Sequence, residues 1–188
     1  MSNYRYFTFF ADGQQENYAA QIEGLLAANY SSFTETKANG ERTGIYLVTN
    51  TAGIRESVAF WKNVQEQTPA FANPANFPWT LSNAPASFFA KALGVKGPVF
   101  TMVGKADALA YCFDRAAGDF HHEVIDSAWI IGIHQENEKL EIGIFFATGV
   151  VDMKEIAHLA TVIRLPEILP LNPDAVSSMQ QVFLPVIN

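Results

Sequence analysis

Residues 98–134 read PVFTMVGKADALAYCFDRAAGDFHHEVIDSAWIIGIH. Two short apolar runs, at 98–103 and 128–134, are typical of strands, and the Ala-rich segment between them, 105–117, is typical of a helix. A helix between two such strands is the pattern of a right-handed crossover that joins parallel strands. This stretch therefore predicts an α/β fold.

The flanking sequence extends the same alternation of strands and helices. The polar turn at 135–138 predicts a hairpin between the strand at 128–134 and the next one. Further strands are expected at 4–11, 43–50 and 139–151, and further helices at 14–30, 54–67, 81–95 and 153–159. In the helix at 81–95, Ser82 or Asn83 is the expected cap and Gly94 the expected end. We expect a five-stranded mixed sheet with helices on its faces.

The length predicts one domain over residues 1–188, since domains usually hold about 100–200 residues. Prolines punctuate residues 160–188, for which we expect an irregular, Pro-rich apolar tail. Pro69, Pro74 and Pro78 indicate a long loop after the helix at 54–67. The aromatic residues that flank this loop favour core or interface packing over a ligand platform: Trp61, Phe71, Phe77 and Trp79.

The composition of the chain indicates which kinds of partner and location to expect. The net charge is −7 and the 12 Lys and Arg residues are scattered, so we expect no nucleic-acid partner. The longest apolar stretches, 128–133 and 142–151, are far shorter than the roughly 20 residues that span a bilayer, and no signal peptide is predicted. Cys112 is the only cysteine, so no intrachain disulfide can form. These features favour a cytoplasmic location.

Residues 73–116 resemble the amino-terminal half of β-ketoacyl synthases of the thiolase-like family. The similarity consists of a Pro-x-x-Phe run at 74–77, the pair Asn83-Ala84, the pair Gly97-Pro98 before a strand, and an Ala-rich helix after Thr101. It extends to the strand at 43–50 and to a closing antiparallel strand at 141–146. The family fold has two similar halves, and the resemblance implies a thiolase-like half-fold here.

The same resemblance bears on the reactive site. In the active family members a nucleophilic cysteine follows the third strand, and the matching position here is Val103, beside Gly104. Valine cannot form a thioester, and the catalytic histidines of the family come from the carboxy-terminal half, which the resemblance does not cover. Thr101, Val103 and Gly104 are therefore candidate positions of a degenerate acyl site, with no catalytic residue predicted.

The family also dimerises by pairing its third strand across a two-fold axis. That implies an interface strand here, made of Pro98, Val99, Phe100 and Met102. A short apolar strand at a sheet edge is an aggregation hazard unless it is paired.

Other reactive side chains have simpler interpretations. Cys112 is expected to be a buried structural thiol, because free cysteines are usually buried; a reactive thiol would need a nearby cation. His121 and His122 are expected in the connection after the third-strand helix as solvated residues, and His134 and His158 at the surface or an interface. Two charged pairs, Asp114 with Arg115 and Asp119 with Glu123, indicate a solvated face. We expect no metal and no cofactor, since nucleotide and metal motifs are missing.

The leading hypothesis is a non-catalytic ketosynthase-like subunit that acts by association in fatty-acid or polyketide-type biosynthesis. Its partner would be a second copy or an active ketosynthase, with an acyl carrier protein as a further candidate. One alternative is a small acyl-binding or acyl-transfer accessory enzyme, with Asn83, Thr101 or Lys105 facing a cavity. Another is a fragment-like product of a larger synthase.

Overall fold

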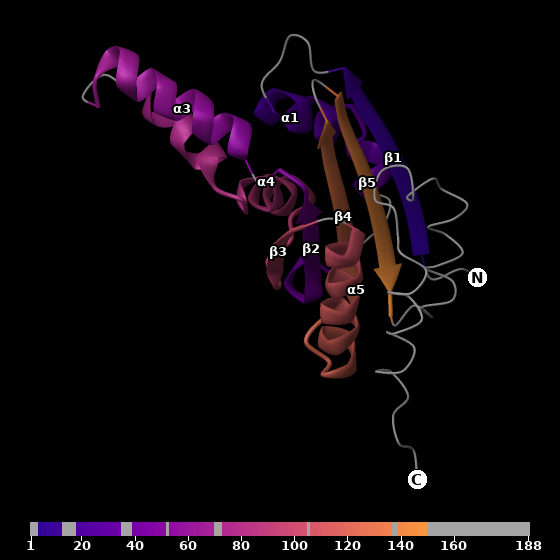
Figure 1. Cartoon of the computed structure of the whole chain (residues 1–188). Coiled ribbons are helices and arrows are strands. Elements are labelled where there is room, and N and C mark those ends of the chain that lie inside the picture. The colour runs from indigo at the N-terminus through magenta and orange to yellow at the C-terminus, as the bar shows by residue number, and fades with distance from the viewer. Residues whose placement is uncertain are drawn as a thin grey trace.

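A computed structural model describes residues 4–12, 18–34, 39–51, 53–69, 73–104, 106–136 and 139–149 (Figure 1). The elements are, in chain order, β1 (Tyr4–Asp12), α1 (Tyr18–Ala28), α2 (Tyr30–Thr34), the 3-10 helix η1 (Gly40–Arg42), β2 (Thr43–Thr49), α3 (Ile54–Gln67), the 3-10 helix η2 (Pro74–Thr80), α4 (Ala84–Leu93), β3 (Val99–Val103), α5 (Ala106–His121), β4 (Ser127–Glu136) and β5 (Lys139–Thr148).

The strands form one mixed sheet in the order β1-β5-β4-β2-β3. β2 runs parallel to both β3 and β4, while β5 pairs antiparallel with β4 and with β1. The predicted α/β class, the mixed sheet and the hairpin of the last two strands are confirmed. β3 lies at one end of the strand order, so β2 is its only neighbour among the described strands.

Helices cover both faces of the sheet, as Figure 1 shows. On one face, α5 packs on alternate residues of β2, β4 and β5 around Tyr46, Cys112 and Ile130. On the other face, α1, α2 and α4 pack on the intervening residues around Ile22, Phe89 and Trp129. β2 is buried along its whole length because helices lie on both of its sides.

Several predicted boundaries were wrong. The helix expected at 14–30 is described as α1 and α2, which are separated by a turn at Asn29. The helix α5 runs to His121 instead of ending at 117, and β4 is longer than expected at both ends. Part of the proline-containing loop is the 3-10 helix η2. Propensity fixes such ends poorly, because tertiary packing decides how far a helix continues.

The α4 boundaries follow the predicted signals in part. Pro85 lies in the first turn, and Gly94 ends the helix in the left-handed conformation, at φ 66°. Asn83 stands at the cap position, but its side chain makes no capping hydrogen bond.

Several predicted features fall outside the described residues. The strand end after residue 149, the helix at 153–159 with His158, and the tail at 160–188 lie outside the described residues, as do Phe71 and Lys105. Within the described part, no helix has both the length and the apolar character needed to cross a membrane.

Candidate functional site

The three parallel strands β2, β3 and β4 have their carboxyl ends side by side, at one end of the strands. In the parallel register, Thr49 at the end of β2 lies opposite Val103 of β3 and Ile133 of β4. Ligands of open α/β sheets bind outside the carboxyl ends of the strands. This edge, which also carries Gly104, is therefore the place where the fold would hold a reactive group.

Asn50 closes the gap between β2 and β4 at this edge. Its Nδ2 donates to the carbonyl oxygen of Gln135 at 2.9 Å, and its Oδ1 accepts from the backbone N–H of Gln135 at 2.9 Å. The side-chain amide thus acts like one more peptide group of the ladder. Thr51 Oγ1 adds a contact to Gln135 Oε1 at 3.2 Å. These polar groups are hydrogen-bonded to one another, and the bonds fix the end of β2 against β4.

Val103 and Gly104 lie beside the hydrogen-bonded pair Asn50 and Gln135, at the turn into α5. The Val103 side chain is 51% exposed, and the Gly104 N–H donates to the carbonyl oxygen of Thr49 at 3.1 Å. A Cβ atom on Gly104 would lie 2.6 Å from Cβ of Ala108, so the first turn of α5 packs directly on the glycine. An isopropyl group thus stands at this exposed position, and it offers neither a lone pair nor an ionisable proton.

Thr101 points to the same sheet face as Val103, because side chains two residues apart in a strand share a face. Its register partner is Leu47, which belongs to the core beneath α1 and α4. The Thr101 Oγ1 atom is buried and has no hydrogen-bond partner. A hydroxyl in that condition typically costs about 1–3 kcal/mol of folding free energy.

The other side chains of β3 point alternately to the two faces of the sheet. Phe100 and Met102 pack against the core beneath α5, and both are partly buried. Val99 lies on the other face and is 47% exposed, and Pro98 precedes the strand with its carbonyl oxygen accepting from the N–H of Ile45 at 2.8 Å. The four residues of the predicted interface strand thus all belong to the outermost described strand or its start, but their side chains do not lie on a single face of the sheet.

Cys112 is not part of the exposed turn between β3 and α5. It lies in the interior of α5, fully buried in the core between the helix and the sheet. Burial raises the pKa of the Cys112 thiol to about 12, so the thiolate is scarce at neutral pH. The predicted buried structural thiol is confirmed.

The three described histidines do not share one site. His121 is the last residue of α5, not part of a connection as predicted, and His122 follows it; both are exposed, with ring centroids 5.3 Å apart. His134 lies half-buried in β4. Among the residues that the structure describes, no three His, Cys, Asp or Glu side chains are grouped so that they could hold a metal ion.

The solvated face predicted around Asp119 was wrong. Asp119 is only 5% exposed, and its Oδ2 accepts a 2.6 Å hydrogen bond from the hydroxyl of fully buried Tyr46. Arg115, one turn earlier, forms an ion pair with Asp119 Oδ1 at 3.0 Å. Desolvation, with a further contribution from the hydrogen bond to Asp119, raises the pKa of Tyr46 well above its usual value. A tyrosine in a buried strand needs an acceptor for its hydroxyl, and that requirement was the available sequence signal.

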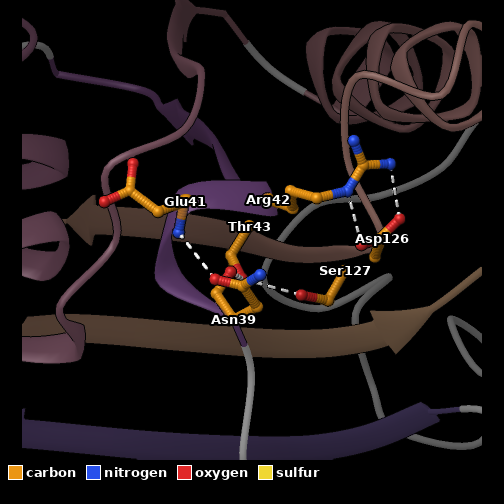
Figure 2. Close-up of polar contacts among 6 residues, drawn as sticks. All are labelled: Asn39, Glu41, Arg42, Thr43, Asp126 and Ser127. Carbon is orange, nitrogen blue, oxygen red and sulfur yellow. Dashed lines mark hydrogen bonds and ion pairs between the residues drawn. The ribbon is translucent and has the colours of Figure 1, made fainter.

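A second polar cluster lies at the opposite edge, where β2 and β4 begin (Figure 2). Arg42 binds Asp126 through two contacts, Nε to Oδ2 at 2.5 Å and Nη2 to Oδ1 at 2.7 Å, and this pairing lowers the pKa of Asp126. Thr43 Oγ1 donates to the carbonyl oxygen of Asn39 and therefore accepts from Ser127 Oγ, 2.8 Å away. Each polar group is used in fixing the strand ends together, so the cluster is structural.

Comparison with solved structures identifies the fold. The ishigamide ketosynthase/chain length factor superposes with a TM-score of 0.54 at 14% identity, over 59% of this chain and 37% of that one. A ketosynthase in complex with its chain length factor, from Xenorhabdus doucetiae, gives 0.53 at 9% identity, over 74% of this chain and 64% of that one.

The chain therefore has a thiolase-like, ketosynthase-like fold, and it spans 37% and 64% of the lengths of these two structures. No protein-family model matches the sequence, and no curated protein matches it either.

Proposed function

We propose that this chain is a non-catalytic ketosynthase-like subunit that acts by association in fatty-acid or polyketide-type biosynthesis. The observation that carries the proposal is the side chain at the turn from β3 into α5. The resemblance implies that Val103 occupies the nucleophile position. Val103 is exposed and carries an isopropyl group, while the chain's one thiol is buried in α5 with a pKa of about 12. A chain with no nucleophile at this position would contribute to condensation through binding, not through a covalent intermediate.

The open side of β3 supports association as the mode of action. β3 pairs with β2 alone in the described sheet, and an unpaired strand edge is a template for another strand. The edge strand carries no charged side chain that would repel a partner strand. Pro98, Val99, Phe100 and Met102 would then form the contact, with a second copy or with an active ketosynthase.

The association is tested by sedimentation of the chain alone and mixed with a purified ketosynthase, at several concentrations. We expect a complex in at least one of the two samples. Val99→Lys places a charge on the edge strand β3 and should abolish the complex, whereas Tyr111→Lys, on a similarly exposed residue of α5, should not. A chain that stays monomeric when concentrated, and binds neither ketosynthase nor acyl carrier protein, would contradict the proposal.

Catalysis is tested separately with an acyl thioester of an acyl carrier protein as substrate. Intact-protein mass spectrometry should show no acyl adduct on the chain. Thioester hydrolysis that disappears in Cys112→Ala would overturn the non-catalytic assignment.

A second candidate function, an acyl-binding accessory protein, is favoured by one observation. The buried Thr101 Oγ1 has no partner, and a polar ligand group could provide one. Binding of an acyl thioester by the wild type, weakened in Thr101→Val, would support this role. Equal binding by both proteins would remove Thr101 from it.

A further inference from the structure

The sequence contains a single Asn-Gly pair, Asn39-Gly40, and it lies at the start of η1. Asparagine is a thermolabile residue, and a following glycine makes it more so, because no side chain hinders the next main-chain nitrogen. Asn39 is exposed and Gly40 is half-buried. Water therefore has access to the side chain that would react.

The fold requires the glycine of this pair. A Cβ atom on residue 40 would overlap the carbonyl oxygen of Gly94, and a Cβ atom on Gly97 would overlap the carbonyl oxygen of Thr43. η1 and the turn before β3 thus pack backbone to backbone, and a residue with a side chain does not fit at position 40. The glycine that makes Asn39 labile is for this reason also the residue that lets the two segments meet.

Asn39 has a structural role as the cap of η1. Its Oδ1 accepts a hydrogen bond from the N–H of Glu41 at 3.2 Å (Figure 2). Its carbonyl oxygen accepts from the N–H of Arg42 at 3.0 Å and from the hydroxyl of Thr43. A short polar side chain is the usual choice for such a cap. Both members of the labile pair are therefore used by the fold.

η1 connects the beginnings of three strands. The carbonyl oxygen of Gly40 accepts from the N–H groups of Lys96 and Gly97, at 2.9 and 3.2 Å, and so holds the turn that leads into β3. The carbonyl oxygen of Arg42 accepts from the N–H of Asp126 at 2.8 Å, directly before β4. η1 itself leads into β2. A change in the backbone at the start of η1 would therefore act on the pairing of β2 with its neighbours.

We propose that Asn39 is a site of spontaneous covalent modification, and that its isoaspartate product releases the turn before β3 from η1. The Gly40 nitrogen forms a bond to Cγ of Asn39, the bond from Cγ to the amide nitrogen breaks, and this nitrogen leaves as ammonia with the Gly40 proton. Water then opens the cyclic imide at one of its two carbonyl groups, which gives aspartate or isoaspartate. The inference does not depend on the proposed association.

The two products differ in the main chain. Aspartate leaves the backbone unchanged, and its carboxylate still accepts from the N–H of Glu41, since Asp and Asn are about equally good caps. Isoaspartate directs the main chain through Cβ, which adds one carbon–carbon bond of about 1.5 Å before Gly40. A shift of that size takes the Gly40 oxygen out of hydrogen-bonding range of Lys96 and Gly97.

The modification is tested by ageing the full, folded chain at physiological temperature and neutral pH. Mass spectrometry of the tryptic peptide that covers residues 38–42 measures deamidation and the isoaspartate content. Asn83 is the internal control, because it is exposed and its side chain makes no capping hydrogen bond, but Ala84 follows it. We expect Asn39 to convert and Asn83 to stay intact. Conversion of Asn39 no faster than that of Asn83 would overturn the site.

The structural effect is tested on the deamidated chain isolated by ion exchange. Asn39→Asp is the matched control, since it carries the same charge on an unaltered backbone. We expect the amide protons of Lys96 and Gly97 to exchange at least about tenfold faster in the isoaspartate form than in Asn39→Asp, with a lower urea midpoint. Asn39→Asp should behave like the wild type. Equal exchange rates in the two proteins would keep the modification site and overturn its effect on the turn.

Discussion

The hydroxyl of Tyr46 donates a 2.6 Å hydrogen bond to Oδ2 of Asp119, and this contact joins the middle of β2 to the last turns of α5. Both side chains are buried, and Arg115 occupies the other carboxylate oxygen. The Tyr46 hydroxyl and both carboxylate oxygens of Asp119 thus have partners. Buried pairs of this kind contribute mainly by the penalty that follows when one member is removed.

Tyr46→Phe should lower the free energy of unfolding by about 1–3 kcal/mol, because Asp119 then keeps a desolvated oxygen without its donor. Urea unfolding at neutral pH measures the change. Tyr111→Phe, on an exposed residue of the same helix as Asp119, should change stability by less than about 0.5 kcal/mol. Equal stabilities of Tyr46→Phe and the wild type would mean that the hydrogen bond makes no net contribution.

Stability should fall at alkaline pH through Cys112. Burial raises its pKa from 9.0 to about 12 in the folded chain, so the thiol stays protonated there while the unfolded chain releases the proton. The stabilising contribution is complete below pH 9 and is lost as the pH rises toward 12, at up to about 1.4 kcal/mol per pH unit. Unfolding free energies measured between pH 8 and about 11 test this slope.

The matched variant for that measurement is Cys112→Ala. It should be less stable than the wild type at neutral pH, because it leaves a small cavity, and its stability should decline less steeply above pH 9. Tyr46 adds to the alkaline loss in the same direction, since its pKa is also raised, and it does so equally in both proteins. Identical slopes would contradict the assignment to Cys112.

Gly44→Ala should destabilise the chain by about 1–3 kcal/mol, the usual cost of overpacking a core. A Cβ atom at residue 44 would lie 2.6 Å from Cε2 of Tyr46, whose ring lies over the glycine. Gly24→Ala is the contrasting variant, because no atom lies within 4 Å of a Cβ there and the residue belongs to α1. It should stabilise the chain by about 0.5–1 kcal/mol through helix propensity. Thermal unfolding of both variants should show shifts of opposite sign.

Val103→Cys should create a thiol that reacts with iodoacetamide in the folded protein, because residue 103 is half-exposed at the turn into α5. The wild type should react far more slowly, since its buried thiol has a pKa of about 12. Intact-mass measurement over time counts the adducts. Fast labelling of the wild type would contradict the buried position of Cys112.

Several features could be predicted from the sequence because they depend on local pattern. The apolar runs at 43–50 and 128–134 predicted strands, the first of them buried, and residues 43–49 and 128–133 are buried strand residues. Gly94 marked the end of α4, since glycine readily adopts the positive φ that this end requires. Burial of Cys112 followed from its place in a predicted helix.

Other features depend on contacts between distant parts of the chain. Asp119 looks like a surface residue in sequence, and it is buried because α5 continues past residue 117 and sets its carboxylate over Tyr46, 73 residues away. The apolar residues of α3 have the spacing of a core-facing helix. Spacing predicts which side of the helix is apolar, but it does not predict what that side packs against.

By itself, the sequence determined the alternation of strands and helices, the valine where the resemblance expects a sulfur nucleophile, and the net negative charge. Only the tertiary structure decided that β3 lies at one end of the described strand order and that the described residues leave the apolar side of α3 exposed. It also decided that a tyrosine and an aspartate meet in the core. The physical reason is the distance along the chain over which each interaction acts. Side-chain period and backbone preference act within a few residues, whereas strand order and burial are set by packing among segments far apart in the chain.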